Sequence, residues 1–162
     1  MIPRIPTATC RIQLREGVDF AALTARLDQI ADLGVSHLYL SPIFAATEGS
    51  THGYDITDPT RIDDSLGGAE GFAALAEQAK ARDLGIILDI VPNHTAFSVQ
   101  NPWLADVLTH GRSSPRARHF DIDWQAGPLV LPWLPAPFEQ MLTEGAFRVR
   151  DGQWTLGALA LP

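Results

Sequence analysis

The sequence is poor in cysteine, in positive charge and in long apolar runs. Its 162 residues include one cysteine, Cys10, so no disulfide can form within the chain, and a reducing compartment is expected. The net charge of −7 argues against nucleic acid and anionic membranes as partners. No run approaches the about 18 apolar residues of a membrane span, and residues 1–10 lack the apolar run of a secretory signal. We therefore expect a cytoplasmic protein.

Nucleotide-binding loops are also missing. The chain contains neither a GxGxxG nor a Walker-type sequence, so no nucleotide cofactor is indicated and no other cofactor is expected. Cys10 has no neighbouring signature of a nucleophile. One basic stretch, RSSPRARH at residues 112–119, is interpreted either as a solvated loop or as a phosphate site.

What the sequence does contain is a repeated helix and strand. Residues 19–34, DFAALTARLDQIADLG, predict one helix that begins at the N-cap Asp19 and ends near Gly34. The strand sequence VSHLYLSP follows at residues 35–42. The second copy has its helix within residues 69–85 and its strand in IILDIVP, residues 86–92. The apolar faces of the two helices are formed by Phe20, Leu23, Leu27 and Ile30, and by Phe72, Leu75, Ala76 and Ala79.

A third strand precedes both copies. TATCRIQL, residues 7–14, alternates with Ala8, Cys10, Ile12 and Leu14 on one side. Strands that alternate with helices predict an α/β fold with a parallel sheet. The connection at residues 43–70 is unusually long and is expected to be functional. After residue 94 the sequence predicts a short helix around residues 102–109 and a few short strands. We place a boundary near Thr95, between domains 1–94 and 95–162.

Two polar clusters follow predicted strands. The loop GSTHGYDITDP, residues 49–59, contains His52, Tyr54 and Asp55, while the segment DIVPNH, residues 89–94, contains Asp89, Asn93 and His94. Ligands of parallel β/α folds bind at the carboxyl ends of the strands. We therefore expect both clusters to lie on one rim of the sheet.

Asp89 is the most informative of these residues because it lies inside an apolar run, where burial without a partner would be costly. It either ties down a loop or an arginine, or serves a functional site. Tyr54 is interpreted either as core or as a platform that stacks on a sugar ring, and His52 and His94 either as loop histidines or as ligands. The four tryptophans are interpreted as packing residues in preference to platforms for a ligand.

Two site chemistries remain open on the residues alone. Imidazole and carboxylate suit zinc or non-haem iron, so a metal site is conceivable at His52, Asp55, Asp89 and His94, although the spacing fits no compact metal signature. Alternatively, polar side chains around an aromatic face form a carbohydrate subsite.

Several motifs together resemble the α-amylase superfamily of glycoside hydrolases. They are STHGYDITDP, GIILDIVPNH and the intervening LGG, and DIVPNH resembles the superfamily's signature at the third barrel strand. The sequences IPTATCRIQL, LGVSHLYLSPI, GSTHGYDITDPTRI, NPWLADVL and FDIDW are similar, more narrowly, to the maltooligosyl trehalose synthases, which are (1→4)-α-D-glucan 1-α-D-glucosylmutases. The resemblance extends from about Ile5 to the end.

The resemblance implies the first three strands of a (β/α)₈ TIM barrel, followed by part of the irregular insert after the third strand. It also implies an enzyme of trehalose biosynthesis that rearranges the reducing-end α-1,4 linkage of a maltooligosaccharide into an α,α-1,1 linkage. This intramolecular transglycosylation proceeds through a covalent glycosyl-enzyme intermediate, as in retaining enzymes.

The resemblance further implies a role for each candidate residue. Asp89 would orient other side chains, Asn93 would brace the strand-end loop, and His94 would bond a sugar hydroxyl. Tyr54 would stack on that sugar, supported by His52 and Asp55.

The family's nucleophilic Asp and acid/base Glu belong to the fourth and fifth strands, and no residue from 95 to 162 matches them. No catalytic residue is therefore expected in this chain, and the remainder of the barrel is an expected partner. The alternatives are an inactive remnant that binds glucan, and part of an α-amylase-type hydrolase.

Overall fold

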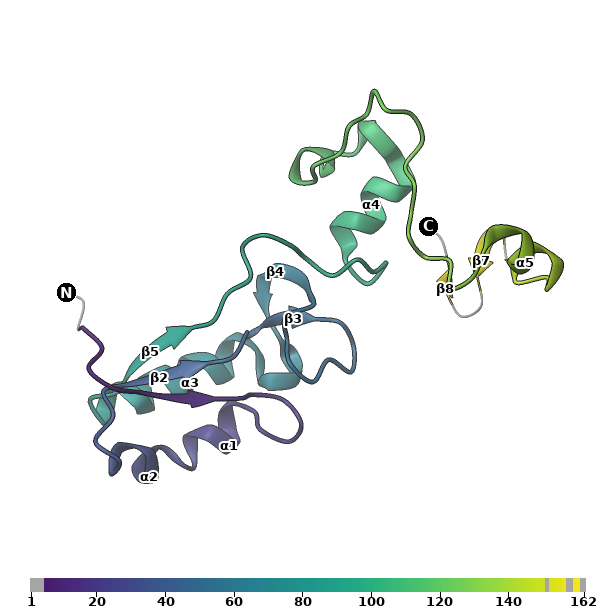
Figure 1. Ribbon diagram of the computed structural model, residues 1–162. Coiled ribbons are helices and arrows are strands. Elements are labelled where there is room, and N and C mark those ends of the chain that lie inside the picture. Colours follow the sequence, from purple (N-terminus) through teal and green to yellow (C-terminus); the bar gives the residue numbers. More distant parts are fainter. Residues whose placement is uncertain (1–4, 151, 157–158, 161–162) are drawn as a thin grey trace. The chain divides into compact units, whose positions relative to one another are not determined.

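The computed structural model describes residues 5–150, 152–156 and 159–160. The chain divides into two compact units, residues 1–97 and 98–162, which are described separately (Figure 1). Within the described ranges, no helix is both long and apolar enough to cross a membrane.

A parallel three-stranded sheet organises the first unit. It consists of β1 (Thr9–Ile12), β2 (His37–Leu40) and β5 (Gly85–Leu88) in the order β1-β2-β5 (Figure 1). The register places Arg11 beside Tyr39, and Tyr39 beside Ile87. Because side chains alternate along a strand, these three residues share one face of the sheet. The parallel α/β prediction is thereby confirmed, although β1 is shorter than the predicted residues 7–14.

The opposite face of the sheet packs against helices. Leu38 and Leu40 of β2 are fully buried in one apolar cluster with side chains from α1 (Phe20–Thr24), α2 (Leu27–Ala31) and α3 (Gly68–Ala81). The helical residues predicted to face the core are buried at Phe20, Leu23, Leu27, Ile30, Leu75 and Ala79, while Phe72 is partly buried against the same cluster.

The predicted single helix at residues 19–34 is wrong, because the structure divides it into α1 and α2. Asp19 caps α1 as expected by accepting from the Ala22 amide at 2.7 Å. The Thr24 hydroxyl donates to the Phe20 carbonyl at 2.7 Å, a contact that commonly bends helices. Arg26 then departs from helical dihedrals, with φ −109° and ψ −1°. Gly34 lies beyond the α2 C-cap, Asp32, and has a positive φ of 74°.

The connection at residues 43–70 is not the continuous loop that the sequence suggested. It contains β3 (Phe44–Ala46) and β4 (Ile56–Ile62), which pair antiparallel, and the 3₁₀ helix η1 (Asp64–Leu66). Asp63 caps η1 through the Ser65 amide and forms a buried ion pair with Arg15 at 2.9 Å. This pair attaches the connection to the segment that follows β1.

The last strand of the first unit is also shorter than predicted. The sequence predicted Asp89 within the strand, but β5 ends at Leu88 and Asp89 lies directly after it. The Asp89 amide still donates to the Leu40 carbonyl at 2.9 Å, which continues the ladder by one bond. The strand does not extend to Pro92, a residue that has no amide hydrogen for a further ladder bond.

The second unit begins with α4 (Pro102–His110), which matches the helix predicted around residues 102–109. The Asn101 side chain caps it by accepting from the Trp103 and Leu104 amides. Two 3₁₀ helices follow, η2 (Gly111–Ser113) and η3 (Ala117–His119), and then α5 (Phe138–Thr143). The predicted short strands are β6 (Phe147–Arg150), β7 (Gln153–Leu156) and β8 (Leu159–Ala160), which form an antiparallel sheet.

The basic stretch at residues 112–119 lies within η2, η3 and the turn between them. Its arginines are exposed, and the Arg116 guanidinium lies over the Trp103 ring, 4.9 Å from the centroid. That exposure agrees with the interpretation of this stretch as a solvated loop.

Candidate functional site

The site is centred on Asp89, whose side chain is 17% exposed at the carboxyl end of β5. Three donors reach its Oδ2 atom: the Tyr54 hydroxyl at 2.7 Å, Nη1 of Arg11 at 3.1 Å and the Tyr39 hydroxyl at 3.2 Å. The expectation that this carboxylate has partners is confirmed. The pairing with Arg11 also agrees with the simpler alternative, a carboxylate that ties down an arginine and a loop.

Tyr54 connects the two polar clusters that the sequence placed on one rim. It lies in the loop between β3 and β4, and its hydroxyl donates to Asp89 while accepting from Nη2 of Arg11 at 2.8 Å. The prediction that the strand-end segments meet is therefore confirmed for Tyr54 and Asp89. The half-buried ring combines an apolar surface with a fixed hydroxyl, which suits a ligand with both carbon faces and hydroxyl groups.

The contacts at this centre lower the pKa of Asp89 and raise those of Tyr54 and Arg11. The hydrogen bond from Tyr54 lowers the pKa of Asp89, and the bonds from Arg11 and Tyr39 add to it against the opposing effect of burial. The bond to Asp89 raises the pKa of Tyr54, since ionisation would place two anions together, while Arg11 partly offsets that rise. The stable state is thus an anionic Asp89 beside a neutral phenol.

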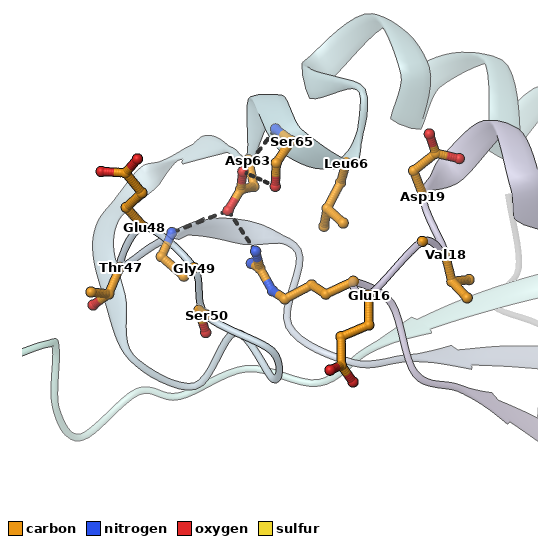
Figure 2. Close-up of a pocket in the computed structure, with 13 residues that line it drawn as sticks. Glu16, Val18, Asp19, Thr47, Glu48, Gly49, Ser50, Asp63, Ser65 and Leu66 are labelled. Atoms are coloured by element: carbon orange, nitrogen blue, oxygen red, sulfur yellow. Dashed lines mark hydrogen bonds and ion pairs between the residues drawn. The ribbon is translucent and has the colours of Figure 1, made fainter.

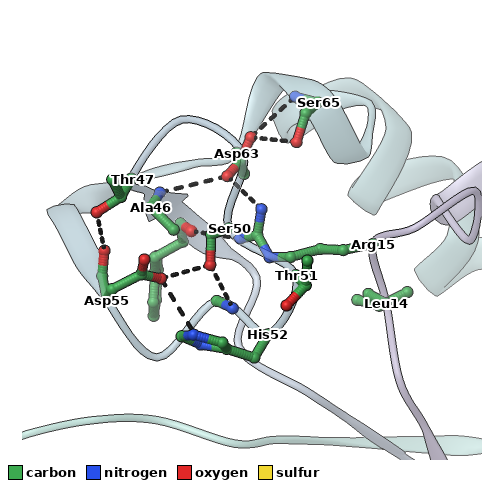
Figure 3. A network of polar contacts seen from close by, with 12 residues as sticks. Leu14, Arg15, Ala46, Thr47, Ser50, Thr51, His52, Asp55, Asp63 and Ser65 are labelled. Atoms are coloured by element: carbon green, nitrogen blue, oxygen red, sulfur yellow. Dashed lines mark hydrogen bonds and ion pairs between the residues drawn. The ribbon is translucent and has the colours of Figure 1, made fainter.

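His52 and Asp55 hold the loop that carries Tyr54 (Figure 3). The Asp55 carboxylate accepts from the Ser50 hydroxyl, and its backbone carbonyl accepts from the Thr47 amide at 3.0 Å. The His52 ring stacks on Tyr54 with centroids 5.9 Å apart. Nδ1 of His52 accepts from the Tyr54 amide at 3.1 Å, so in this tautomer its 3.7 Å approach to Asp55 is not an ion pair.

Asn93 and His94 are both exposed and contact each other, with Nδ1 of His94 3.1 Å from Oδ1 of Asn93. In the part of the chain that the structure describes, no hydrogen bond joins either residue to Tyr54 or Asp89. The structure therefore brings four of the six predicted residues together, His52, Tyr54, Asp55 and Asp89, and leaves these two as a separate pair.

The alternative metal site is not supported by the geometry. Among the described residues, no group of three or more histidine, cysteine, aspartate or glutamate side chains could hold a metal ion. Of the four proposed ligands, Asp89 already accepts hydrogen bonds from two tyrosine hydroxyls and the Arg11 guanidinium. His94 contacts Asn93.

Arg11 and Tyr39 belong to the centre but were missed from the sequence. Both project from the side of their strands that is opposite the helices, and the register makes them neighbours. The Arg11 guanidinium lies over the Tyr39 ring, 4.7 Å from the centroid. The available signal was the alternation in residues 7–14, which puts Arg11 on the side away from the core.

A separate recess of about 500 Å³ lies beside the Arg15–Asp63 ion pair (Figure 2). Residues 47–50 form one side of it, and Glu16, Val18 and Asp19 form another. None of the six predicted site residues lines this recess. Burial alone would raise the pKa of Asp63, but the hydrogen bonds from Ser65 and Arg15 produce a net lowering.

Comparison with known proteins identifies the family to which this chain belongs. Residues 13–133 match the family model described as alpha amylase, catalytic domain. The chain belongs to the alpha-amylase family. The matched range includes Tyr39, Tyr54 and Asp89, and the family accounts for the sheet as part of a (β/α)₈ fold.

Within the alpha-amylase family, the chain is similar to maltooligosyl trehalose synthases. It is 46% identical to the putative maltooligosyl trehalose synthase of Mycobacterium tuberculosis strain H37Rv over 96% of this chain and 21% of that protein. Alpha-amylase 2 of Dictyoglomus thermophilum is 39% identical over 62% of this chain and 17% of that enzyme.

Solved structures agree with this placement. A maltooligosyl trehalose synthase crystal structure matches 98% of this chain and 22% of that chain, with a TM-score of 0.92 and 40% identity. The enzyme from Arthrobacter ramosus matches 97% of this chain and 21% of that chain, with a TM-score of 0.87 and 36% identity. The chain thus spans about a fifth of the length of these relatives and matches their N-terminal part.

Proposed function

We propose that this chain supplies part of the sugar subsite of an enzyme that converts maltooligosaccharides into maltooligosyl trehaloses by intramolecular transglycosylation, a step of trehalose biosynthesis. The observation that carries the proposal is the 46% identity to a maltooligosyl trehalose synthase along 96% of the chain. Sequence similarity of this extent includes the loop of Tyr54 and the end of β5 as well as the scaffold.

The chemistry of the centre supports a sugar ligand. Tyr54 offers an aromatic ring held by its hydroxyl, and His52 stacks on one face of it. A pyranose ring presents C–H groups to such a surface and hydroxyl groups at its edge. In the proposed subsite, Tyr54 stacks on the sugar, Asp89 orients neighbouring groups, and Asn93 and His94 provide hydroxyl contacts when the site is complete.

The proposed organisation follows the same resemblance. Residues 1–94 form the first three strands of the barrel with their helices, and residues 95–162 form part of the insert that follows the third strand. The nucleophile and the acid/base are supplied by later barrel strands, which also complete the sheet around β1 and β5. A cytoplasmic location stays a prediction from the single cysteine and the N-terminal sequence.

The rival activity is α-amylase-type hydrolysis, because an alpha-amylase also matches 62% of the chain at 39% identity. Both reactions use a covalent glycosyl-enzyme intermediate and differ in the acceptor. In the mutase the retained reducing sugar attacks through its anomeric hydroxyl, whereas in the hydrolase water does so.

The deciding experiment is to purify the protein from its own host, at the length it has there, and incubate it with maltopentaose. We expect reducing ends to disappear with no matching release of glucose or maltose. Release of these sugars with a gain of reducing ends would identify a hydrolase. If maltopentaose binds but its reducing ends and chain length stay constant, the glucan-binding alternative replaces the enzyme.

A further inference from the structure

Arg11 makes three contacts that connect a strand to a loop. It extends from β1, and its Nη1 and Nη2 atoms reach Asp89 Oδ2 at 3.1 Å and the Tyr54 hydroxyl at 2.8 Å. The guanidinium carbon lies over the Tyr39 ring, 4.7 Å from the centroid. The planar fork of arginine allows two directed hydrogen bonds and a stacking contact at once. The three polar groups form a closed triangle, since Tyr54 itself donates to Asp89 at 2.7 Å.

The three corners of this triangle are anchored in different ways. Arg11 lies within a strand that pairs with β2, and the backbone of Asp89 is fixed by the hydrogen bond that its amide N–H donates to the Leu40 carbonyl. Tyr54 lies in the loop between β3 and β4, where its own hydrogen bonds are to this centre and to His52. Arg11 and Asp89 are therefore held by the sheet, and their contacts hold the hydroxyl of Tyr54 in its loop.

We propose that Arg11 is a positioning residue, which holds the Tyr54 hydroxyl against Asp89 and thereby fixes the plane of the Tyr54 ring for stacking on the sugar. Arg11 acts through Tyr54 and does not contact the sugar. The proposal rests on the sugar-site function proposed above. It goes further in assigning a role to a residue of β1 that the sequence patterns did not identify.

Two physical consequences distinguish this role from a general contribution to folding. First, the chain has two tyrosines, Tyr39 and Tyr54, so in a Tyr39→Phe background phenol ionisation measured by absorbance reports on Tyr54 alone. Arg11 lowers the pKa of Tyr54 through its hydrogen bond and its charge. Removing Arg11 should therefore move the Tyr54 ionisation to higher pH. Second, the effect of Arg11 on sugar binding should depend on the Tyr54 hydroxyl.

The test compares Arg11→Gln with Arg61→Gln as a matched control. Arg61 also pairs with an aspartate, Asp64, at 2.6 Å, but this pair is exposed and separate from the centre. In the Tyr39→Phe background of the full 162-residue chain, we expect the Tyr54 ionisation to shift to higher pH with Arg11→Gln and to stay unchanged with Arg61→Gln. An unchanged ionisation in Arg11→Gln would overturn the proposed contact.

The second measurement is a double-mutant cycle on maltopentaose affinity. Arg11→Gln should weaken binding about fivefold, the size of a typical coupling between residues in contact, and should have no further effect in a Tyr54→Phe background. A loss of the same size in both backgrounds would contradict a role through Tyr54. If the protein at the length it has in its host binds no maltopentaose, the proposed subsite fails, while the ionisation shift still decides the role of Arg11 at Tyr54.

Discussion

At Asp89, three donors from three parts of the chain meet one carboxylate oxygen. The need for partners could be predicted from the sequence, because a carboxylate in an apolar run is costly to bury alone. The identity of the partners could not. Alternation shows only that Arg11 faces away from the helices, and pairing it with Tyr39 requires the register of two strands that are 28 residues apart along the chain.

The lowered pKa of Asp89 predicts a pH-dependent contribution to stability. The folded-state pKa lies below the unfolded value, mainly because of the hydrogen bond from Tyr54, so the contribution is present above about pH 4 and is lost as the pH falls through the folded-state pKa. Asp89→Asn should lower the free energy of unfolding by about 1 to 3 kcal/mol at pH 7. Urea denaturation followed by circular dichroism measures it.

The control for this prediction is Asp64→Asn, because Asp64 is 76% exposed in its ion pair with Arg61. This substitution should change stability little at any pH, since exposed pairs contribute little. If the gap between the unchanged chain and Asp89→Asn is as large at pH 3 as at pH 7, the charge of Asp89 is not the source of its effect.

At the scale of elements, periodicity located the buried faces better than the element ends. Phe20, Leu23, Leu27 and Ile30 are buried as predicted although their helix is divided. The division at residues 25 and 26 leaves the apolar spacing intact, so hydrophobic periodicity cannot reveal it. The hairpin of β3 and β4 was missed because Pro59 and the polar residues around it read as turn signals.

Helix packing gives the second prediction. Leu75 of α3 is fully buried in the apolar cluster, whereas Leu33 is 70% exposed. Leu75→Ala should lower the free energy of unfolding by about 2 to 5 kcal/mol, because it removes buried methyl groups and leaves a cavity. Leu33→Ala should change it by less than about 0.5 kcal/mol. Equal effects in urea denaturation would contradict the assigned core.

Strand packing gives the third prediction. A Cβ atom at Gly85 would lie 2.2 Å from Cδ2 of His37, a ring that is only 6% exposed. Gly85→Ala should therefore destabilise the pairing of β2 with β5 by about 1 to 3 kcal/mol, the range for overpacked cores. The thermal midpoint measures this. In a His37→Ala background, which removes the ring, the same substitution should cost much less; an undiminished cost there would rule out the clash as its cause.

At the scale of the molecule, the four residues of the polar centre around Asp89 belong to one unit. Arg11, Tyr39, Tyr54 and Asp89 all lie within residues 1–97. Arg11 and Tyr39 come from β1 and β2, Asp89 directly follows β5, and Tyr54 comes from the loop between β3 and β4. This agrees with the general rule that sites of (β/α)₈ folds lie at the carboxyl ends of the strands. The general location of the site could thus be predicted from motif order. The contacts that hold Tyr54 depend on register and on loop folding, which the motifs do not encode.

The most direct test of a sugar subsite at this rim is a titration of the isotope-labelled chain with maltopentaose, followed by the backbone amide resonances. We expect saturable shifts that concentrate around Arg11, Tyr54 and Asp89 and disappear in Tyr54→Ala. An absence of shifts, or shifts confined to residues 98–162, would contradict it.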